Sequence, residues 1–210
     1  MSTESVSYTR ELQRKEGIWW KRLIPVQLPY RWNLQRLRLG FVLDLGCGIG
    51  RNLRNLDGNG VGVDHNDQSV QTSRLRGYRA FTPAQFMESP YARCGTFDSL
   101  LLSHVAEHMH EDECIALLNE YLPFVRPSGQ VVLICPQEAG YASDATHVQF
   151  MDFEALTRSL AALGISPERS YSFPLPRSFG RFFKYNEFVA VGKVPAMLNS
   201  SGANSKGRYG

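Results

Sequence analysis

The sequence predicts an α/β fold: a doubly wound, Rossmann-like domain with a seven-stranded, mostly parallel sheet and an N-terminal helical addition. Seven short strand-like segments alternate with segments of helical pattern, as parallel strands joined by helices require. The first of them, residues 41–45, is apolar without alternation, which is typical of a strand buried on both faces. It leads into three closely spaced glycines, and such a strand–turn–helix unit places backbone N–H groups against a ligand.

Length and composition indicate one globular domain. The 210 residues, 43 % hydrophobic and 20 % charged, suffice for an α/β domain with some decoration. We expect a helical extension or lid over residues 1–40, the main domain over 41–194 and a disordered tail over 195–210. Neither a run of about twenty apolar residues nor a secretory signal is recognisable, so a cytoplasmic location is expected.

Cysteines and charge narrow the function classes. The four cysteines are spread out without a CxxC pair, which fits reduced thiols and argues against a structural zinc site. The formal net charge of +3 allows a nucleic-acid partner without demanding one. Basic residues gather in the first forty residues and again near 177–184; solvated helix faces are the favoured explanation, and an anionic or phosphate-bearing acceptor is the alternative.

The predicted strands are short segments, and several of them end on a residue with useful chemistry. They cover residues 41–45, 61–64, 78–81, 97–102, 130–135, 170–173 and 187–191. In a doubly wound sheet, ligands bind beyond the carboxyl ends of the parallel strands. The glycine turn, Asp64, Thr82, Ser103 and Cys135 all follow or end such strands, so we expect the binding site at this edge.

The predicted helices show helical spacing of apolar residues or recognisable caps. They cover residues 8–23, 30–39, 51–56, 68–76, 84–87, 112–125 and 153–163. Asp67 and Asp152 are expected to cap helix N-termini, and Gly40 and Gly164 to follow helix C-termini. Residues 136–151 show little regular pattern and are expected to form a loop over the C-terminal edge of the sheet.

The glycine turn separates two cofactor classes. The dinucleotide fingerprint needs a small third residue for close packing of helix and strand, and this chain has Arg51 there, which argues against NAD and FAD. Residues 42–50, VLDLGCGIG, instead resemble motif I of class I S-adenosylmethionine-dependent methyltransferases. Residues 62–64, 97–108 and 127–134 resemble, in the same order, the second-strand acid, the fourth strand with its turn, and the fifth-strand passage of that family.

The resemblance implies S-adenosylmethionine as the cofactor. Asp64 would accept hydrogen bonds from the ribose hydroxyls, and the methionine moiety would lie near Asp44 and Gly46. Ser103 would lie under the methionine and sulfonium groups. Asn66 could line the ribose or adenine, although a helix cap explains it equally well. The full set of expected cofactor residues is Asp44, Gly46, Cys47, Gly48, Gly50, Asp64, His65, Thr82, Ser103 and His104.

The segment from His104 to His108 also spells H-x-x-E-H, the inverted zinc-protease signature. On one α-helix, two histidines four residues apart could share a metal. Similar wording occurs in the methyltransferase family without zinc, and the segment follows a buried strand, so we disfavour the protease. A simpler reading is that Glu107 and His108 orient the turn. A divalent metal such as Mg²⁺ stays open, because no tight acidic cluster is visible.

The acceptor side is expected in residues 138–150 and 179–185. His147 is the leading candidate for a general base and His104 the second, because imidazole can take a proton near neutral pH. A hydrogen-bonded loop histidine explains His147 equally well. Asp144 could orient the base or join a metal. The expected substrate-binding residues are Glu138, Tyr141, Phe179 and Tyr185.

These residues predict methyl transfer to a hydroxyl of a small molecule or saccharide. C- or N-methylation of a lipid, quinone or natural product is the alternative within enzymes. A non-catalytic partner protein that binds S-adenosylmethionine is the alternative from another class. The fourth predicted strand lacks the Asn/Asp-Pro-Pro-Tyr element that methylation of base amines uses, which disfavours a nucleic-acid acceptor. Nothing in the sequence requires or excludes a homodimer.

Overall fold

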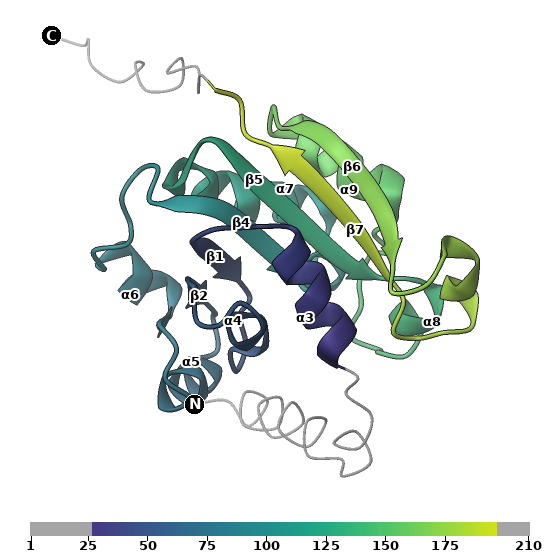
Figure 1. Cartoon of the computed structure of the whole chain (residues 1–210), viewed down its shortest axis with the longest axis horizontal. Helices are drawn as coiled ribbons and strands as arrows, with labels where there is room; N and C mark the ends of the chain where they lie inside the picture. Colours follow the sequence, from purple (N-terminus) through teal and green to yellow (C-terminus); the bar gives the residue numbers. More distant parts are fainter. Residues whose placement is uncertain (1–26, 197–210) are drawn as a thin grey trace, which may run out of the picture.

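A seven-stranded sheet organises residues 27–196, the part of the chain that this computed structural model describes (Figure 1). Its strand order is β3-β2-β1-β4-β5-β7-β6, and only β7 runs antiparallel to its neighbours. The strands are β1 Val42–Leu45, β2 Gly60–Val63, β3 Ala80–Phe81, β4 Phe97–Ser103, β5 Val125–Pro136, β6 Ser166–Phe173 and β7 Glu187–Lys193. The predicted seven-stranded, mostly parallel sheet is confirmed.

Helices cover both faces of this sheet. The α-helices are α3 Gln27–Arg36, α4 Arg51–Asn55, α5 Asp67–Leu75, α6 Pro83–Met87, α7 Glu111–Tyr121, α8 Glu138–Tyr141 and α9 Phe153–Ala162. Three 3-10 helices, η1 Ala106–His108, η2 Leu122–Phe124 and η3 Arg177–Arg181, complete the connections. Figure 1 shows α3 and α4 in front of the sheet and α7 and α9 behind it.

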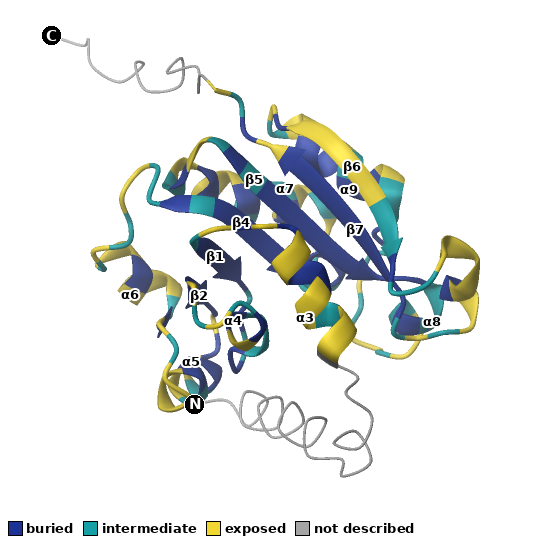
Figure 2. Cartoon of the chain, viewed as in Figure 1, coloured by how far each residue is buried: buried dark blue, intermediate teal, exposed yellow. Residues whose placement is uncertain are grey.

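Alternation along the strands divides the core between the two faces. Val42 packs in the cluster that contains α3, whereas its neighbour Leu43 packs in the cluster of α7 and α9. Central strands are buried on both sides, while the outer surface of α3 and much of β6 are exposed (Figure 2). The continuous apolar pattern of the central strands therefore reflects their sandwiched position.

Several local expectations differ from the structure. Asn66 rather than Asp67 caps α5, because its side chain accepts hydrogen bonds from the backbone N–H groups of Gln68 and Ser69. The expected loop 136–151 contains the short helix α8. The predicted helix 112–125 ends earlier, at Tyr121, and continues as η2.

The residues after β4 form a turn, as the family resemblance implies. The chain turns at His104, whose φ is 58°, and then forms the 3-10 helix η1. The zinc-protease interpretation requires His104 and His108 on one face of an α-helix, and this geometry is therefore not present.

Two predicted segments fall outside the described residues. These are the N-terminal helix over 8–23 and most of the tail from residue 195. Within residues 27–196, no helix has the length and apolar character needed to cross a membrane.

Candidate active site

The glycine turn after β1 adopts backbone conformations that suit glycine. Gly46, Gly48 and Gly50 have φ values of 69°, 51° and 81°. At Gly46 an added Cβ atom would lie 2.3 Å from Cγ2 of Val105, in the segment after β4. This position thus requires glycine for its conformation and for the close approach of a neighbouring segment.

Asp64, directly after β2, holds the turn in place. Its Oδ2 accepts a 2.8 Å hydrogen bond from the backbone N–H of Gly48, and its Oδ1 accepts one of 2.8 Å from that of Asn66. The side chain is 7 % exposed. Each carboxylate oxygen can accept more than one hydrogen bond, so Asp64 can support the turn and still bind a hydroxyl.

Asp44, in β1, is a buried acid with an unfilled acceptor. Its Oδ1 accepts a 3.2 Å hydrogen bond from Asn52, whereas its Oδ2 is buried without a hydrogen-bond partner. Burial raises the pKa of Asp44 to about 7; the Asn52 hydrogen bond lowers it, and the charge of Asp64 raises it further. A cationic group bound at this turn would satisfy Oδ2 and favour the ionised carboxylate.

His104 joins the ends of β4 and β7. Its Nε2 donates a 2.7 Å hydrogen bond to Oε1 of Glu187, and its Nδ1 lies 3.4 Å from Oε1 of Glu107. Burial opposes protonation of this imidazole, but both carboxylates favour it and raise its pKa to about 10. His104 is therefore a cation at neutral pH. A protonated imidazole cannot accept a proton, which argues against His104 as a general base.

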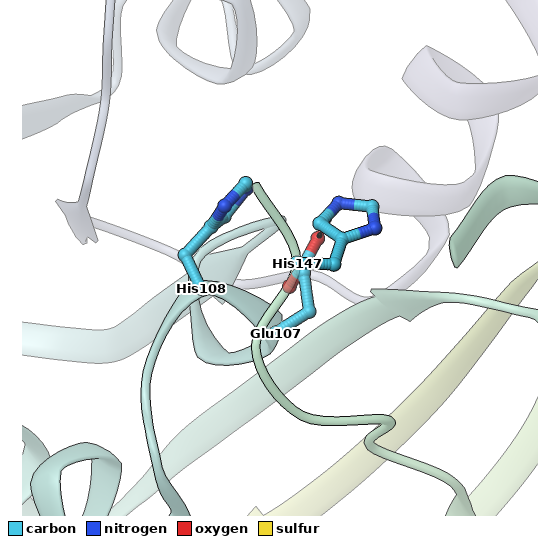
Figure 3. Close-up of side chains that lie close together, drawn as sticks. All are labelled: Glu107, His108 and His147. Atoms are coloured by element: carbon cyan, nitrogen blue, oxygen red, sulfur yellow. Dashed lines mark ion pairs between the residues drawn. The ribbon is translucent and has the colours of Figure 1, made fainter. Parts of the chain in front are cut away.

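Glu107 lies at the centre of a group of histidines. The residue is 1 % exposed, and neither carboxylate oxygen accepts a hydrogen bond. Nε2 of His147 lies 4.0 Å from Oε1 of Glu107, and the rings of His108 and His147 meet edge to face, with centroids 4.8 Å apart. Figure 3 shows the Glu107 side chain between the two imidazole rings.

His147 has a defined orientation and tautomer. Its Nδ1 lies 2.7 Å from the carbonyl oxygen of Tyr141, and since a carbonyl can only accept, Nδ1 carries the proton. The Tyr141 ring stacks on the imidazole at 5.1 Å between centroids. Nε2 is consequently the ring nitrogen that can offer a lone pair, and the side chain is 8 % exposed.

Comparison with known proteins agrees with this geometry. A family model described as "Methyltransferase domain" matches residues 43–133, from β1 to β5. Residues 43–133 form a methyltransferase domain of the class I S-adenosylmethionine-dependent type. The methyl donor is S-adenosylmethionine, and the cradle at Gly46, Asp44 and Asp64 fits its amino and ribose groups. No curated protein sequence matches the chain significantly.

Solved structures share the methyltransferase fold at low sequence identity. A SAM-dependent methyltransferase from Archaeoglobus fulgidus is 18 % identical, with a TM-score of 0.62 over 78 % of this chain and 92 % of its own. The complex of the Haloferax volcanii Trm112 activator and a putative methyltransferase gives 15 % identity and a TM-score of 0.69 over 93 % and 99 %. Magnesium protoporphyrin IX methyltransferase from Synechocystis PCC 6803, with bound SAM, gives 15 % identity and a TM-score of 0.52 over 78 % and 74 %.

Several side chains expected at the methyltransferase cofactor have other contacts. The Cys47 thiol is buried against Val70 and Ala80, and burial raises its pKa. Thr82 caps α6, accepting a hydrogen bond from the backbone N–H of Gln85. The His65 side chain is 90 % exposed and lies 3.8 Å from Asp64. The Cys47 thiol therefore points into the core, so only the backbone of this residue would be available to a ligand at the turn.

The residues expected at the acceptor side come from three segments. Glu138, at the start of α8, forms two hydrogen bonds with Arg177 of η3, so it braces this wall. Phe179 is 49 % exposed. Asp144 accepts hydrogen bonds from the backbone and hydroxyl of Thr146, and its backbone carbonyl accepts one of 3.4 Å from the N–H of His147.

Two features of this wall escaped the sequence analysis. Gln137 is fully buried; it donates to Ser172, and its Oε1 accepts from Asn186, which ties the end of β5 to the segment before β7. Tyr30 of α3 donates a 2.6 Å hydrogen bond to the carbonyl of Tyr185, and burial raises its pKa. Both depend on pairing residues more than thirty positions apart, for which the sequence carries no local signal.

Proposed function

We propose that this methyltransferase methylates a hydroxyl group on a small molecule or saccharide. The observation that carries the proposal is His147, whose Nε2 bears the lone pair at the C-terminal edge of the sheet. A hydroxyl is a weak nucleophile, so methyl transfer to its oxygen is faster when a nearby base removes the hydroxyl proton. When bound, S-adenosylmethionine supplies the electrophilic methyl group.

The residues around His147 suit proton transfer. Nε2 takes the hydroxyl proton as the new O–CH₃ bond forms and the S–CH₃ bond breaks. The carbonyl of Tyr141 keeps Nδ1 protonated, and the Glu107 carboxylate stabilises the resulting imidazolium. The low exposure of His147 keeps water away from the reacting groups.

The cofactor half of the proposed site rests on the two buried acids. Asp44 would bind the amino group of S-adenosylmethionine, and Asp64 its ribose hydroxyls. The turn glycines allow close backbone approach, with Ser103 and the cation His104 at the neighbouring strand end. Thr82 and His65 would lie at the outer rim of this half.

Aromatic residues would form the acceptor wall. Tyr141 of α8 stacks on His147, Phe179 lies half exposed in η3, which packs against α8, and Tyr185 lies between η3 and β7, which supports a common acceptor wall. Such rings bind flat or sugar-like groups through their faces. Magnesium protoporphyrin IX methyltransferase and geranyl diphosphate methyltransferase have folds similar to that of this chain. Their acceptors differ from one another, and their low sequence identity to this chain favours neither acceptor.

The proposal is tested by S-adenosylhomocysteine release with libraries of hydroxyl, amine and carbon acceptors. We expect turnover with hydroxyl acceptors, and a fall of about 10²-fold or more in His147→Ala. His110→Ala, at an exposed histidine of the same region, serves as a matched control and should retain activity. Turnover with carbon or amine acceptors alone would favour the alternative enzyme class, and cofactor binding without any turnover the non-catalytic partner.

A further inference from the structure

We infer that Glu107, His108 and His147 form a binding site for one divalent transition-metal ion such as Zn²⁺. One potential ligand atom from each residue lies within 4.8 Å of the other two. The three residues come from two segments, η1 after β4 and the loop after α8, which the fold brings together (Figure 3). Small side-chain adjustments bring such atoms to the roughly 2.0–2.2 Å distances of zinc ligands.

Both imidazoles are oriented as metal ligands usually are. Nδ1 of His147 donates to the carbonyl of Tyr141, and Nδ1 of His108 lies 3.2 Å from the carbonyl of Thr146. Since carbonyls only accept, both rings carry the proton on Nδ1 and the lone pair on Nε2. Histidines that bind metals are commonly fixed by such a hydrogen bond from the other ring nitrogen.

The buried carboxylate is an independent observation that points to a cation. Glu107 is 1 % exposed, and both oxygens lack a hydrogen bond. Nδ1 of the cation His104 lies 3.4 Å from Oε1 and offsets part of the cost of this buried charge, while its Nε2 is held by Glu187. Oε2 has no hydrogen-bond partner, and a directly bound cation would satisfy this remaining acceptor.

The donor set favours a particular class of metal. Two imidazole nitrogens and one carboxylate suit Zn²⁺, Fe²⁺ or Co²⁺, whereas Mg²⁺ prefers oxygen ligands and water. Within the H-x-x-E-H segment, Glu107 and His108 would therefore be metal ligands and His104 would not. His147, from the loop after α8, would be the third ligand. Three protein ligands leave at least one coordination position open.

The location connects this metal site with the acceptor. Glu107 follows Val105 by two residues, and Val105 contacts the glycine turn at Gly46. The next step rests on the proposed function: the open position would bind the acceptor hydroxyl and lower its pKa, so that its proton passes to solvent as the O–CH₃ bond forms and the S–CH₃ bond of the donor breaks. In the metal-bound protein, His147 would then act as a ligand, and the metal would take over its part in activating the hydroxyl.

Metal binding can be measured without any methyl acceptor. The full chain is treated with chelator, dialysed and titrated with Co²⁺, followed by visible absorption, and with Zn²⁺, followed by calorimetry. We expect one ion per chain and an affinity at least about tenfold lower in His108→Ala, His147→Ala and Glu107→Gln. His65→Ala, at a histidine outside the cluster, should bind Co²⁺ as the unaltered chain does. Circular dichroism checks that each variant is folded.

The outcomes separate this inference from the proposed function. Absence of binding, undiminished binding in the folded cluster variants, or a Co²⁺ spectrum with thiolate bands would overturn the metal site. One-to-one binding that the cluster variants lose would support the site even if no hydroxyl acceptor is turned over. Full hydroxyl methylation by chelated protein, with no stimulation by Zn²⁺, Fe²⁺ or Co²⁺, would overturn the catalytic step while leaving the binding result intact.

Discussion

The backbone N–H of Gly48 donates a 2.8 Å hydrogen bond to Oδ2 of Asp64, linking the turn after β1 to the end of β2. The acid expected to bind the cofactor ribose thus also fixes the turn that is expected to hold the methionine moiety. Since Oδ1 accepts a second hydrogen bond from Asn66, the carboxylate has a defined orientation before any ligand binds. Preorganisation of this kind lowers the entropic cost of binding.

Replacing Asp64 should therefore weaken cofactor binding strongly. Asp64→Ala removes an ionised acceptor of two backbone hydrogen bonds, each contributing about 1.5–3 kcal/mol when the acceptor is charged. We expect at least about tenfold weaker binding of S-adenosylhomocysteine in calorimetry. Asp64→Asn, which keeps one acceptor oxygen, should fall between. An unchanged affinity in a folded Asp64→Ala protein would remove this residue from the cofactor site.

Cofactor affinity should depend on the ionisation of Asp44. Its pKa of about 7 means that this carboxyl is mostly protonated at pH 6 and mostly ionised at pH 8. A cofactor ammonium group favours the ionised form, so binding should weaken as pH falls, by about tenfold between pH 8 and pH 6. Calorimetry across this range measures the effect.

Asp44→Asn provides the control for this pH dependence. The amide cannot ionise, so the variant should bind the cofactor more weakly at pH 8 and show a flatter profile from pH 6 to 8. Folding raises the pKa of this buried acid from about 4 to about 7, so at pH 8 the negative charge destabilises the folded state. Asp44→Asn removes that charge and should melt at a higher temperature than the unaltered chain at pH 8. An equally steep profile in Asp44→Asn would place the titrating group elsewhere.

Gly46→Ala should destabilise the turn in two separable ways. The φ of 69° costs about 1–2 kcal/mol for a residue with a Cβ atom. The added atom would also lie 2.3 Å from Val105 Cγ2. Val105→Ala in the same chain should relieve the contact and leave the conformational cost. Urea unfolding of the four proteins of this cycle measures both terms, and full rescue by Val105→Ala would contradict the backbone cost.

Asp98 should contribute stability at neutral pH that is lost in acid. The hydrogen bond from the N–H of Phe41 lowers the pKa of Asp98, and Arg126 lowers it further. A lowered pKa in the folded state stabilises the protein above the unfolded pKa of about 3.9, and this contribution disappears as pH falls through the folded value. Asp98→Asn should lose about 1 kcal/mol at pH 7, a modest value because the side chain is partly exposed.

The acid-dependent difference identifies this effect. Urea unfolding at pH 7 and at pH 3 compares Asp98→Asn with the unaltered chain, and the two proteins should converge at the lower pH. Arg126→Gln tests the second contact and should show a smaller loss. A loss in Asp98→Asn that persists unchanged in acid would indicate packing instead of charge.

Patterns within short segments predicted most of the sheet and the cofactor edge. The apolar run at 41–45, the glycine turn and the acid after the second strand lie together in the structure as expected. Errors occurred where two neighbouring residues share a property: Asn66 and Asp67 can both cap a helix, and only the backbone conformation selects Asn66. The position of Cys47 in the turn likewise does not reveal that its thiol packs against Val70 and Ala80, because this contact depends on the placement of α5 and β3.

By itself, the sequence determined the fold class and the methyl donor, since both depend on contiguous patterns: buried strands, a glycine turn and an acid at a strand end. Only the tertiary structure decided how the histidines are used. Glu187 holds His104 from a strand 83 residues away, which leaves His147 to face Glu107 and His108. Such pairings arise from the strand order, which brings the start of β7 and the loop after β5 beside the end of β4, and no local pattern of residue types encodes which side chains meet.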